Sequence, residues 1–266
     1  MLKRFVLIAL LLISVRAEAR EYTDVYYDPA ESGWGAFLVQ SDTTQFLALF
    51  IYGPDGKPTW YVGIIADDGT GNYTGTLYAT TGTYFAAPWQ GYLANAVGTL
   101  SFQPTDRYHA TLTYTVNGVG TVTKQVQRQT LTPYVLSGTY SGSMAGSISG
   151  CTDPTANETP FRGSYGLEVT QNGDQSASLT FTFVDTKHNG LVCTLSGPLT
   201  HLGRLYQFNG QSTCAGGPVP PGGSPKPATI DGLHPTGQGI EGYFTGPTGG
   251  GCQASLHFSA VLNVNN

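Results

Sequence analysis

Apolar and polar residues alternate with a period of two along most of this chain, from Trp34 to Leu262. The stretch 107–116 shows the pattern best, with Tyr108, Leu112 and Tyr114 on one side and threonines on the other. Successive side chains of a strand point to opposite faces, so this pattern predicts strands with one buried and one solvated face. After the first twenty residues, no window of helical length carries a 3.6-residue period. The sequence therefore predicts an all-β protein.

The first nineteen residues, 1–19, have the pattern of a secretory signal peptide. Lys3 and Arg4 begin it, the apolar stretch 5–15 follows, and Ala17-Glu18-Ala19 matches an A-x-A cleavage site. The apolar stretch is too short for an ordinary membrane-spanning helix, although an uncleaved anchor is the alternative. We expect a periplasmic or extracellular protein that does not span a membrane after cleavage.

Charged residues are scarce and their balance is acidic. They make up 11% of the chain, and the formal net charge is −5. Nucleic acids and anionic lipid surfaces are bound through basic patches, and the sequence has no basic run that could form one. We therefore expect no nucleic-acid partner.

The four cysteines all lie in the second half of the chain, at Cys151, Cys193, Cys214 and Cys252. An even number behind a signal peptide indicates two disulfides formed in an oxidising compartment. A turn near residues 201–203 sets Cys193 opposite Cys214, and the two ends of a closed antiparallel meander bring Cys151 to Cys252. We favour this pairing among the three possible ones. The alternative of a zinc site has little support because no C-x-x-C pair occurs.

Turn signals divide the chain into two modules, residues 20–128 and 129–266, with about eight short strands each. Asn117-Gly118 is a two-residue hairpin signal, and the Gly- and Pro-rich stretch 215–227 excludes a strand. Eight antiparallel strands can close into an up-and-down barrel without exposed edges. We prefer two tandem barrels to two sandwiches, since the Cys…Trp…Cys spacing of immunoglobulin domains is missing.

The first module carries three consecutive motifs: Tyr22-Thr23-Asp24, the stretch 28–35 (DPAESGWG) and the stretch 52–62 (YGPDGKPTWYV). Together they resemble a module that recurs in secreted proteobacterial proteins, alone, in tandem or appended to larger exported proteins. This chain has Tyr26-Tyr27 and Asp28 where that family more often has paired tryptophans and asparagine. The resemblance covers residues 22–128 and implies secretion and a module boundary. It implies no activity.

A much shorter match opens the second module. Leu136-Ser137-Gly138-Thr139-Tyr140 resembles the first strand of avidin-like and lipocalin-like barrels, with tyrosine in place of their tryptophan. The resemblance implies an eight-stranded cup with a cavity for a small molecule.

Residues suited to catalysis or metal binding form no recognisable constellation. We interpret Asp28 and Glu31 as a turn rather than a pair of catalytic carboxylates, and the stretch 67–72 as a plain loop rather than a calcium site. No nucleophile elbow, phosphate-binding loop or dinucleotide motif occurs. We expect no catalytic residue, cofactor or metal. We interpret all five histidines as surface residues: His109, His188, His201, His234 and His257.

Aromatic residues are the one enriched class that suits ligand binding. All three tryptophans lie in the first module, and tyrosine and tryptophan combine apolar area with a polar tip. The candidate ligand-binding residues are Trp34, Trp60, Tyr61, Trp89, Tyr26 and Tyr27. The alternative is that these side chains fill the barrel core. The aromatic segment 81–95 is expected to pack over one end of the module.

Three classes of function remain, in order of preference. The first is a secreted, non-catalytic binding module for a polymer, peptide or small molecule. The second is a structural or accessory protein of the cell envelope, and the third is a hydrolase without a recognisable motif. The expected partner is accordingly an unidentified ligand or an envelope component.

Overall fold

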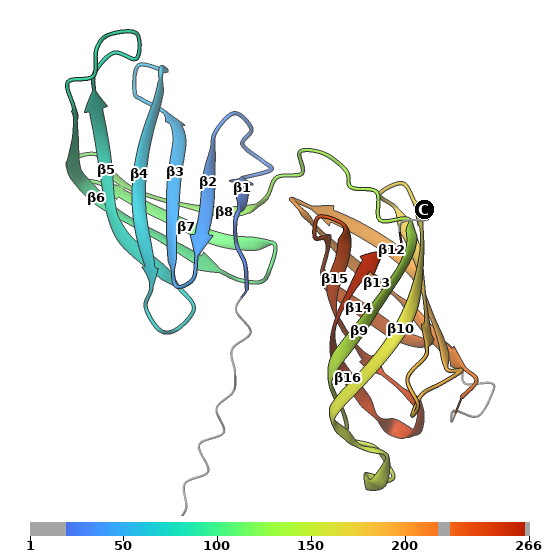
Figure 1. Ribbon diagram of the computed structural model, residues 1–266. Coiled ribbons are helices and arrows are strands. Elements are labelled where there is room, and N and C mark those ends of the chain that lie inside the picture. Colours follow the sequence, from blue (N-terminus) through green and yellow to red (C-terminus); the bar gives the residue numbers. More distant parts are fainter. Residues whose placement is uncertain (1–19, 218–223, 264–266) are drawn as a thin grey trace, which may run out of the picture.

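The protein folds into two closed, eight-stranded antiparallel barrels in tandem, which confirms the all-β prediction (Figure 1). The computed structural model describes residues 20–217 and 224–263, so the predicted signal peptide lies outside the described residues. Each strand pairs with its neighbours in sequence, and the last pairs with the first. This up-and-down order is that of a barrel and not of a sandwich.

Barrel 1 contains the first eight strands. They are β1 (Asp24–Tyr27), β2 (Gly35–Ser41), β3 (Thr44–Tyr52), β4 (Pro58–Asp67), β5 (Tyr73–Gly82), β6 (Tyr92–Pro104), β7 (His109–Val116) and β8 (Gly120–Arg128). Barrel 2 contains β9 (Gly138–Ser149), β10 (Glu158–Asn172), β11 (Ser176–Phe183), β12 (Val192–Leu202), β13 (Leu205–Ala215), β14 (Lys226–Pro235), β15 (Gly239–Pro247) and β16 (Gln253–Leu262). Two short 3₁₀ turns, η1 (Pro154–Ala156) and η2 (Gly249–Gly251), belong to barrel 2.

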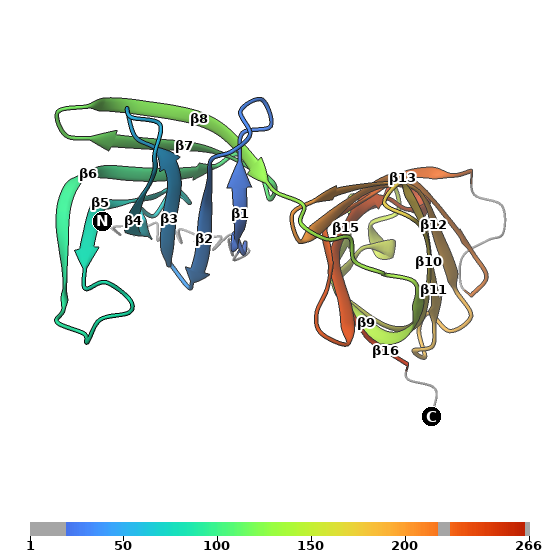
Figure 2. The same ribbon diagram turned by 90° about the horizontal axis from the view of Figure 1, so that it is seen from above.

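The two barrels close differently. In barrel 1 the closing pair, β1 and β8, is short and joins Tyr26 to Arg128 and Tyr27 to Gln127. In barrel 2 the closing strands β16 and β9 pair along their whole length, from Gln253–Ser149 to Leu262–Tyr140. Figure 2 looks nearly along the axis of barrel 2 and shows its strands as a ring.

A turn forms at Asn117-Gly118, but it is a three-residue loop, 117–119, and not the two-residue hairpin that the sequence predicts. Val116 pairs with Gly120 across the β7–β8 hairpin, and the Val119 N–H donates to the Val116 carbonyl. Gly118 has a φ of 75°, a left-handed conformation that costs a glycine little.

Side chains fill the interior of barrel 1. The inward positions of adjacent strands supply fully buried leucines, and the rings of Tyr26 and Phe102 meet edge to face with centroids 5.0 Å apart. A Cβ atom added at Gly63 would lie 2.8 Å from the Leu100 side chain, which shows how tightly this interior is occupied. Barrel 1 is thus a packed core, as small eight-stranded barrels can be.

Barrel 2 is closed at the end nearest barrel 1 by the connecting segment 129–137, which crosses it (Figure 1). The Tyr134 N–H donates to the Tyr206 hydroxyl at 3.0 Å, and the Leu136 N–H donates to the Gln171 side chain at 2.7 Å. Leu136 and Tyr140 are buried there, and the Tyr140 hydroxyl donates to the Leu136 carbonyl. The linker is therefore the floor of barrel 2.

Buried polar contacts join the two barrels through the β6–β7 turn of barrel 1. The Tyr108 hydroxyl accepts from the Gly232 N–H at 2.8 Å and donates to the Tyr206 carbonyl at 3.3 Å. Next to it, Arg107 Nε lies 2.6 Å from the Asp231 carboxylate, and its guanidinium lies 4.2 Å from the centroid of the Tyr243 ring. A buried charge needs such partners, so these contacts define one mutual orientation of the barrels.

A second set of contacts involves the β12–β13 turn. Asp24 pairs with the buried Arg128 at 2.9 Å within barrel 1, and it also accepts from the Arg204 N–H of barrel 2 at 3.0 Å. Gly203 precedes that residue with a φ of 66°, and a Cβ there would lie 2.2 Å from an Asp24 oxygen. Only glycine at this position allows the backbone of the β12–β13 turn to approach Asp24 this closely.

Both disulfides form as the strand geometry predicts. Cys193 and Cys214 face each other on β12 and β13, and Cys151 joins Cys252 beside β9 and β16. The second bridge closes a stretch of 101 residues, which covers nearly all of barrel 2. Two such bridges are typical of proteins that fold in an oxidising compartment.

The aromatic segment 81–95 does not pack over the end of barrel 1, as we expected from the sequence. Strands β5 and β6 continue beyond the barrel as a hairpin arm (Figure 1), and Phe85, Trp89 and Tyr92 on it are 91%, 71% and 69% exposed. The alternation continues into this arm, so β6 begins at Tyr92 and not near Val97. Residues 78–82 of β5 pair with residues 92–96 of β6 along the arm. This pairing holds the segment in an extended hairpin and keeps it from folding over the end of the barrel.

Candidate functional site

The interior of barrel 2 contains a cavity of about 780 Å³ at the end opposite the linker. Residues of all eight strands line it, and most of them are apolar. The large apolar wall residues on strands are Met144, Ile148, Phe161, Phe181, Phe183, Leu195, Phe244, Leu256 and Phe258. The rim is formed by the two 3₁₀ turns, by His188 and by Lys226. In Figure 1 this rim lies at the bottom of barrel 2, where β9 leads into η1.

Small residues at inward positions help to keep this end open. Ser212 on β13 pairs with Leu195 on β12 and points inward, and Ala254 on β16 pairs with Ile148 on β9. In an eight-stranded barrel the interior is just wide enough for side chains to fill it or for one small ligand. Small side chains at such positions therefore leave room for a ligand.

One polar group is buried among the aromatic walls. His188, in the β11–β12 loop, is 6% exposed and packs on Phe161 and Phe183, with ring centroids 4.9 and 5.8 Å away. Its Nδ1 lies 2.8 Å from the Asp185 carboxylate, so Nδ1 carries the proton and Nε2 is an acceptor when the ring is neutral. Nε2 lies 3.3 Å from Glu158, but it makes no hydrogen bond with any described residue.

The carboxylate behind His188 is held in its ionised form. Burial alone would raise the pKa of Asp185, but hydrogen bonds from the backbone N–H and ring of His188, with one from the Ser164 N–H, outweigh burial. The pKa of Asp185 is consequently below its ordinary value. A charged Asp185 holds a proton on His188 Nδ1, and Nε2 faces the Glu158 carboxylate at 3.3 Å.

The sequence prediction that all histidines lie on the surface is wrong for two of them. His188 is buried in the cavity wall, and the His201 side chain is 4% exposed and stacked on Tyr206 at 4.2 Å. His109 and His257 do lie on outward, solvated faces, with side chains 45% and 44% exposed. A loop histidine gives no periodic signal of burial, so the sequence alone could not identify His188.

The structure does not bring the six aromatic candidates of the first module together. Tyr26 lies in the core, 1% exposed, and its hydroxyl donates to the Tyr22 carbonyl. Trp34 and Tyr61 pack against the core from partly buried positions. Trp60 is exposed on the outer wall, and Trp89 is exposed on the hairpin arm. The half-buried Tyr27 lies on β1, beside the closing strand.

The acidic candidates form local turns, as predicted. The Asp28 carboxylate accepts from the Ala30 N–H at 2.9 Å, and Glu31 forms an ion pair with Lys124 at 2.6 Å. In the loop 67–72, the Asp67 and Asp68 carboxylates accept hydrogen bonds from N–H groups of the same loop. The Asp28, Asp67 and Asp68 carboxylates thus stabilise their own turns, whereas Glu31 pairs with a lysine of β8.

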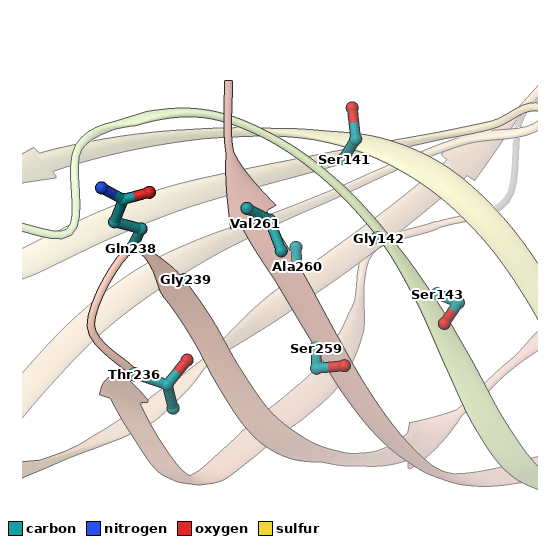
Figure 3. Close-up of a pocket in the computed structure, with 9 residues that line it drawn as sticks. All are labelled: Ser141, Gly142, Ser143, Thr236, Gln238, Gly239, Ser259, Ala260 and Val261. Atoms are coloured by element: carbon teal, nitrogen blue, oxygen red, sulfur yellow. The ribbon is translucent and has the colours of Figure 1, made fainter. Parts of the chain in front are cut away.

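A second depression lies on the outer wall of barrel 2, where β9, β15 and β16 meet (Figure 3). Its volume is about 440 Å³, and serine, threonine, glutamine and small residues line it. Figure 3 shows Thr236 and Gln238 beside the short side chains of Ser259 and Ala260. The lining carries no charge and no aromatic ring, so the barrel interior is the better candidate for a ligand site.

Within residues 20–217 and 224–263, no three histidine, cysteine, aspartate or glutamate residues are placed to hold a metal ion. The same ranges contain no helix with the length and hydropathy that a bilayer crossing requires.

Comparisons with known proteins find structural likeness only. No protein-family model matches the chain, and no curated protein matches it. Among solved structures, it is similar to a candidate outer membrane protein from Bacteroides fragilis, with 14% identity over 90% of this chain and 97% of that one, and a TM-score of 0.30. It is also similar to transferrin-binding protein B from Haemophilus parasuis, with 9% identity, 90% and 67% coverage and a TM-score of 0.31. The same protein from Neisseria meningitidis matches with 10% identity, 91% and 69% coverage and a TM-score of 0.25. Scores this low transfer neither fold nor function to this chain.

Proposed function

We propose that this is an exported, non-catalytic binding protein whose barrel 2 holds one small, largely apolar molecule. The observation that carries the proposal is the cavity of about 780 Å³ inside that barrel. Ligand sites in proteins are concave, mostly apolar, and typically about 300–1,000 Å³ in volume. The two disulfides support an oxidising location outside the cytoplasm.

The polar groups of the cavity narrow the class of ligand. His188 Nε2 is buried, lies 3.3 Å from the Glu158 carboxylate and makes no hydrogen bond among the described residues. His188 and the neighbouring Glu158 carboxylate both line the cavity, so a ligand hydroxyl or N–H near them would find an acceptor. The ligand is therefore an apolar molecule that carries one hydrogen-bond donor near one end.

A titration with N-phenyl-1-naphthylamine tests the site, because this dye is apolar, has a single N–H and fluoresces more strongly in apolar surroundings. We expect saturable binding of one dye per chain. Ser212→Leu fills the cavity from an inward position and should abolish the fluorescence increase. Ser196→Leu is the matched control, because Ser196 is exposed on the outer face of β12. Equal binding by the two variants would contradict the proposal.

Competition of the dye with an alcohol and with an ether tests whether the site prefers a ligand that carries a hydrogen-bond donor. We expect 1-decanol to displace the dye at lower concentration than methyl decyl ether, by roughly two- to tenfold, which corresponds to one hydrogen bond. His188→Phe should abolish this difference while leaving dye binding in place. Tryptophan emission should stay unchanged throughout, because all three tryptophans lie in barrel 1. Preference for the ether in the wild-type protein would exclude a donor-bearing ligand.

A further inference from the structure

One wall of barrel 1 exposes large apolar side chains on three adjacent strands. The outward positions of β2, β3 and β4 carry these residues, which we call the apolar wall: Phe37, Val39, Phe46, Ala48, Phe50, Tyr52, Trp60, Val62 and Ile64. Seven of the nine are 39–64% exposed. On the opposite side of the barrel, β7 and β8 present rows of threonines that bond to one another, such as Thr113 with Thr123.

The sequence of β3 is that of a strand covered on both faces. Phe46–Tyr52 reads FLALFIY, an unbroken apolar run, whereas a strand with one solvated face alternates. Leu47 and Leu49 point into the barrel and are fully buried. Phe46 and Phe50 point outward and are 43% and 55% exposed. The outer face of β3 is therefore suited to burial but is uncovered in the single chain.

The area of the apolar wall is close to what a stable interface needs. Its five aromatic residues are about half exposed, and an aromatic side chain offers about 150–250 Å², so they present roughly 400–600 Å² together. Val39 and Ile64 add to this area. The largest apolar patch of a typical monomer is about 300–600 Å², and a standard protein interface buries about 800 Å² per partner.

Charge indicates a second copy of the same chain as the partner. The apolar wall contains no charged residue, so two copies can meet face to face without burying a charge. Charges lie only beyond the two ends of β3: Asp42 in the turn before it lies near Asp67 at the end of β4, whereas Lys57 in the turn after it is paired with Asp55 of the same turn. When two β3 strands cross in antiparallel directions, the acidic end of each copy lies toward the neutral Asp55–Lys57 turn of the other copy. A parallel crossing would bring like charges together.

The positions of the side chains on the apolar wall also fit two copies related by a two-fold axis with antiparallel β3 strands. Ala48 is the central residue of β3 and is almost buried, between the larger Phe46 and Phe50. Rotation about an axis through this point sets Phe46 of one copy over Phe50 of the other. Because Trp60 pairs with Phe50 and Ile64 pairs with Phe46, the same rotation sets Trp60 over Ile64.

We propose that the apolar wall of β2–β4 is the interface of a homodimer, in which the two sheets pack face to face with antiparallel β3 strands. This contact is isologous, because each copy uses the same surface, and it closes the assembly at two chains. The apolar wall belongs to barrel 1 and shares no residue with the cavity of barrel 2, so this proposal does not depend on the proposed ligand site.

Sedimentation equilibrium of the purified protein, without added ligand, tests the interface. We expect a dimer in the wild-type protein. Phe50→Lys places a charge in the middle of the wall and should raise the dissociation constant by roughly a hundredfold or more. Ile64→Lys, at the most exposed position of the wall, should have the same direction of effect. Thr123→Lys, among the outward threonines of β7 and β8, is the matched control and should remain dimeric. Circular dichroism should confirm that each variant is folded.

Mixing two variants tests the antiparallel orientation. Phe46→Glu and Phe50→Lys should each be monomeric alone, and the mixture should form a heterodimer because the new charges face each other. A monomeric wild-type protein would overturn the proposal, as would equal dimerisation of Phe50→Lys and Thr123→Lys. Binding of the monomer to phosphatidylcholine vesicles would also overturn it, because the wall would then face lipid.

Discussion

Barrel 1 and barrel 2 have the same number of strands in the same order, yet they distribute their apolar side chains in opposite ways. Barrel 1 is filled inside and exposes apolar residues on β2–β4, whereas barrel 2 is hollow at one end and has a mainly polar outer wall. The comparison teaches that strand number fixes only the approximate width of such a barrel. The side chains at the inward positions decide whether the interior is a core or a site.

The two disulfides give the largest expected difference between the barrels. Replacing Cys151 and Cys252 by alanine should destabilise barrel 2 by about 4–5 kcal/mol, since the bridge closes 101 residues, and should leave barrel 1 unchanged. The second bridge spans 21 residues, so its removal should cost about 3 kcal/mol. Hydrogen exchange resolved by strand, against denaturant, measures both. Equal loss of protection in the two barrels would contradict the assignment of the bridges to barrel 2 alone.

A matched pair of leucine truncations compares the two interiors directly. Leu49→Ala in the filled core of barrel 1 should cost about 3–5 kcal/mol, because it opens a new cavity. Leu256→Ala on the wall of barrel 2 should cost less, about 1–2 kcal/mol, because that side chain already borders empty space on one side. Denaturant unfolding followed by tryptophan emission reports barrel 1, and calorimetry reports both. A larger loss for Leu256→Ala would indicate that the cavity is filled.

Removing one hydroxyl tests how firmly the barrels are joined. Tyr108→Phe leaves the Gly232 N–H without its 2.8 Å partner and should cost about 1–2 kcal/mol. We expect the two barrels, which the interface couples, to unfold at more widely separated temperatures in this variant. Tyr92→Phe on the exposed arm is the control and should change nothing. A coincident transition in the Tyr108→Phe variant would show that the hydroxyl does not couple the barrels.

Acid should weaken barrel 2 at the rim of its cavity. The pKa of Asp185 is lower in the folded protein than in an unfolded chain, where it is about 3.9, because the hydrogen bonds from His188 and Ser164 outweigh the effect of burial. Its contribution to stability is therefore complete above that unfolded value and is lost as the pH falls through the folded value. Thermal unfolding of wild type and Asp185→Asn should converge as the solution is acidified. A difference in unfolding temperature between the two proteins that stays constant with pH would show that ionised Asp185 does not stabilise barrel 2.

The sequence predicts the barrels well because their causes are local. Alternation, the Asn117-Gly118 turn and the positions of the four cysteines each act over a few residues or one strand pair, and the structure confirms two tandem barrels and both disulfides. The cavity has no such local cause. It depends on side chains such as Ser212 and Phe258, which are far apart in the sequence and meet only when the ring has closed.

The aromatic residues show a similar limit. A tryptophan on a strand points in or out according to register, and neighbours in sequence point to opposite faces, so Trp60 is exposed while Tyr61 packs against the core. Enrichment in the first module therefore predicted a ligand site that the positions of these side chains do not form together. The sequence does carry a signal for the apolar outer wall of barrel 1: the unbroken apolar run of Phe46–Tyr52 departs from the alternation seen elsewhere in the chain.

The most direct test of a hollow barrel beside a filled one is the position of xenon in crystals of the protein under xenon pressure. Xenon enters dry apolar cavities and is excluded from well-packed cores. We predict xenon density inside barrel 2, between Phe161, Phe181 and Phe258, and no xenon inside barrel 1. Density in the interior of barrel 1, or an empty barrel 2, would contradict this account.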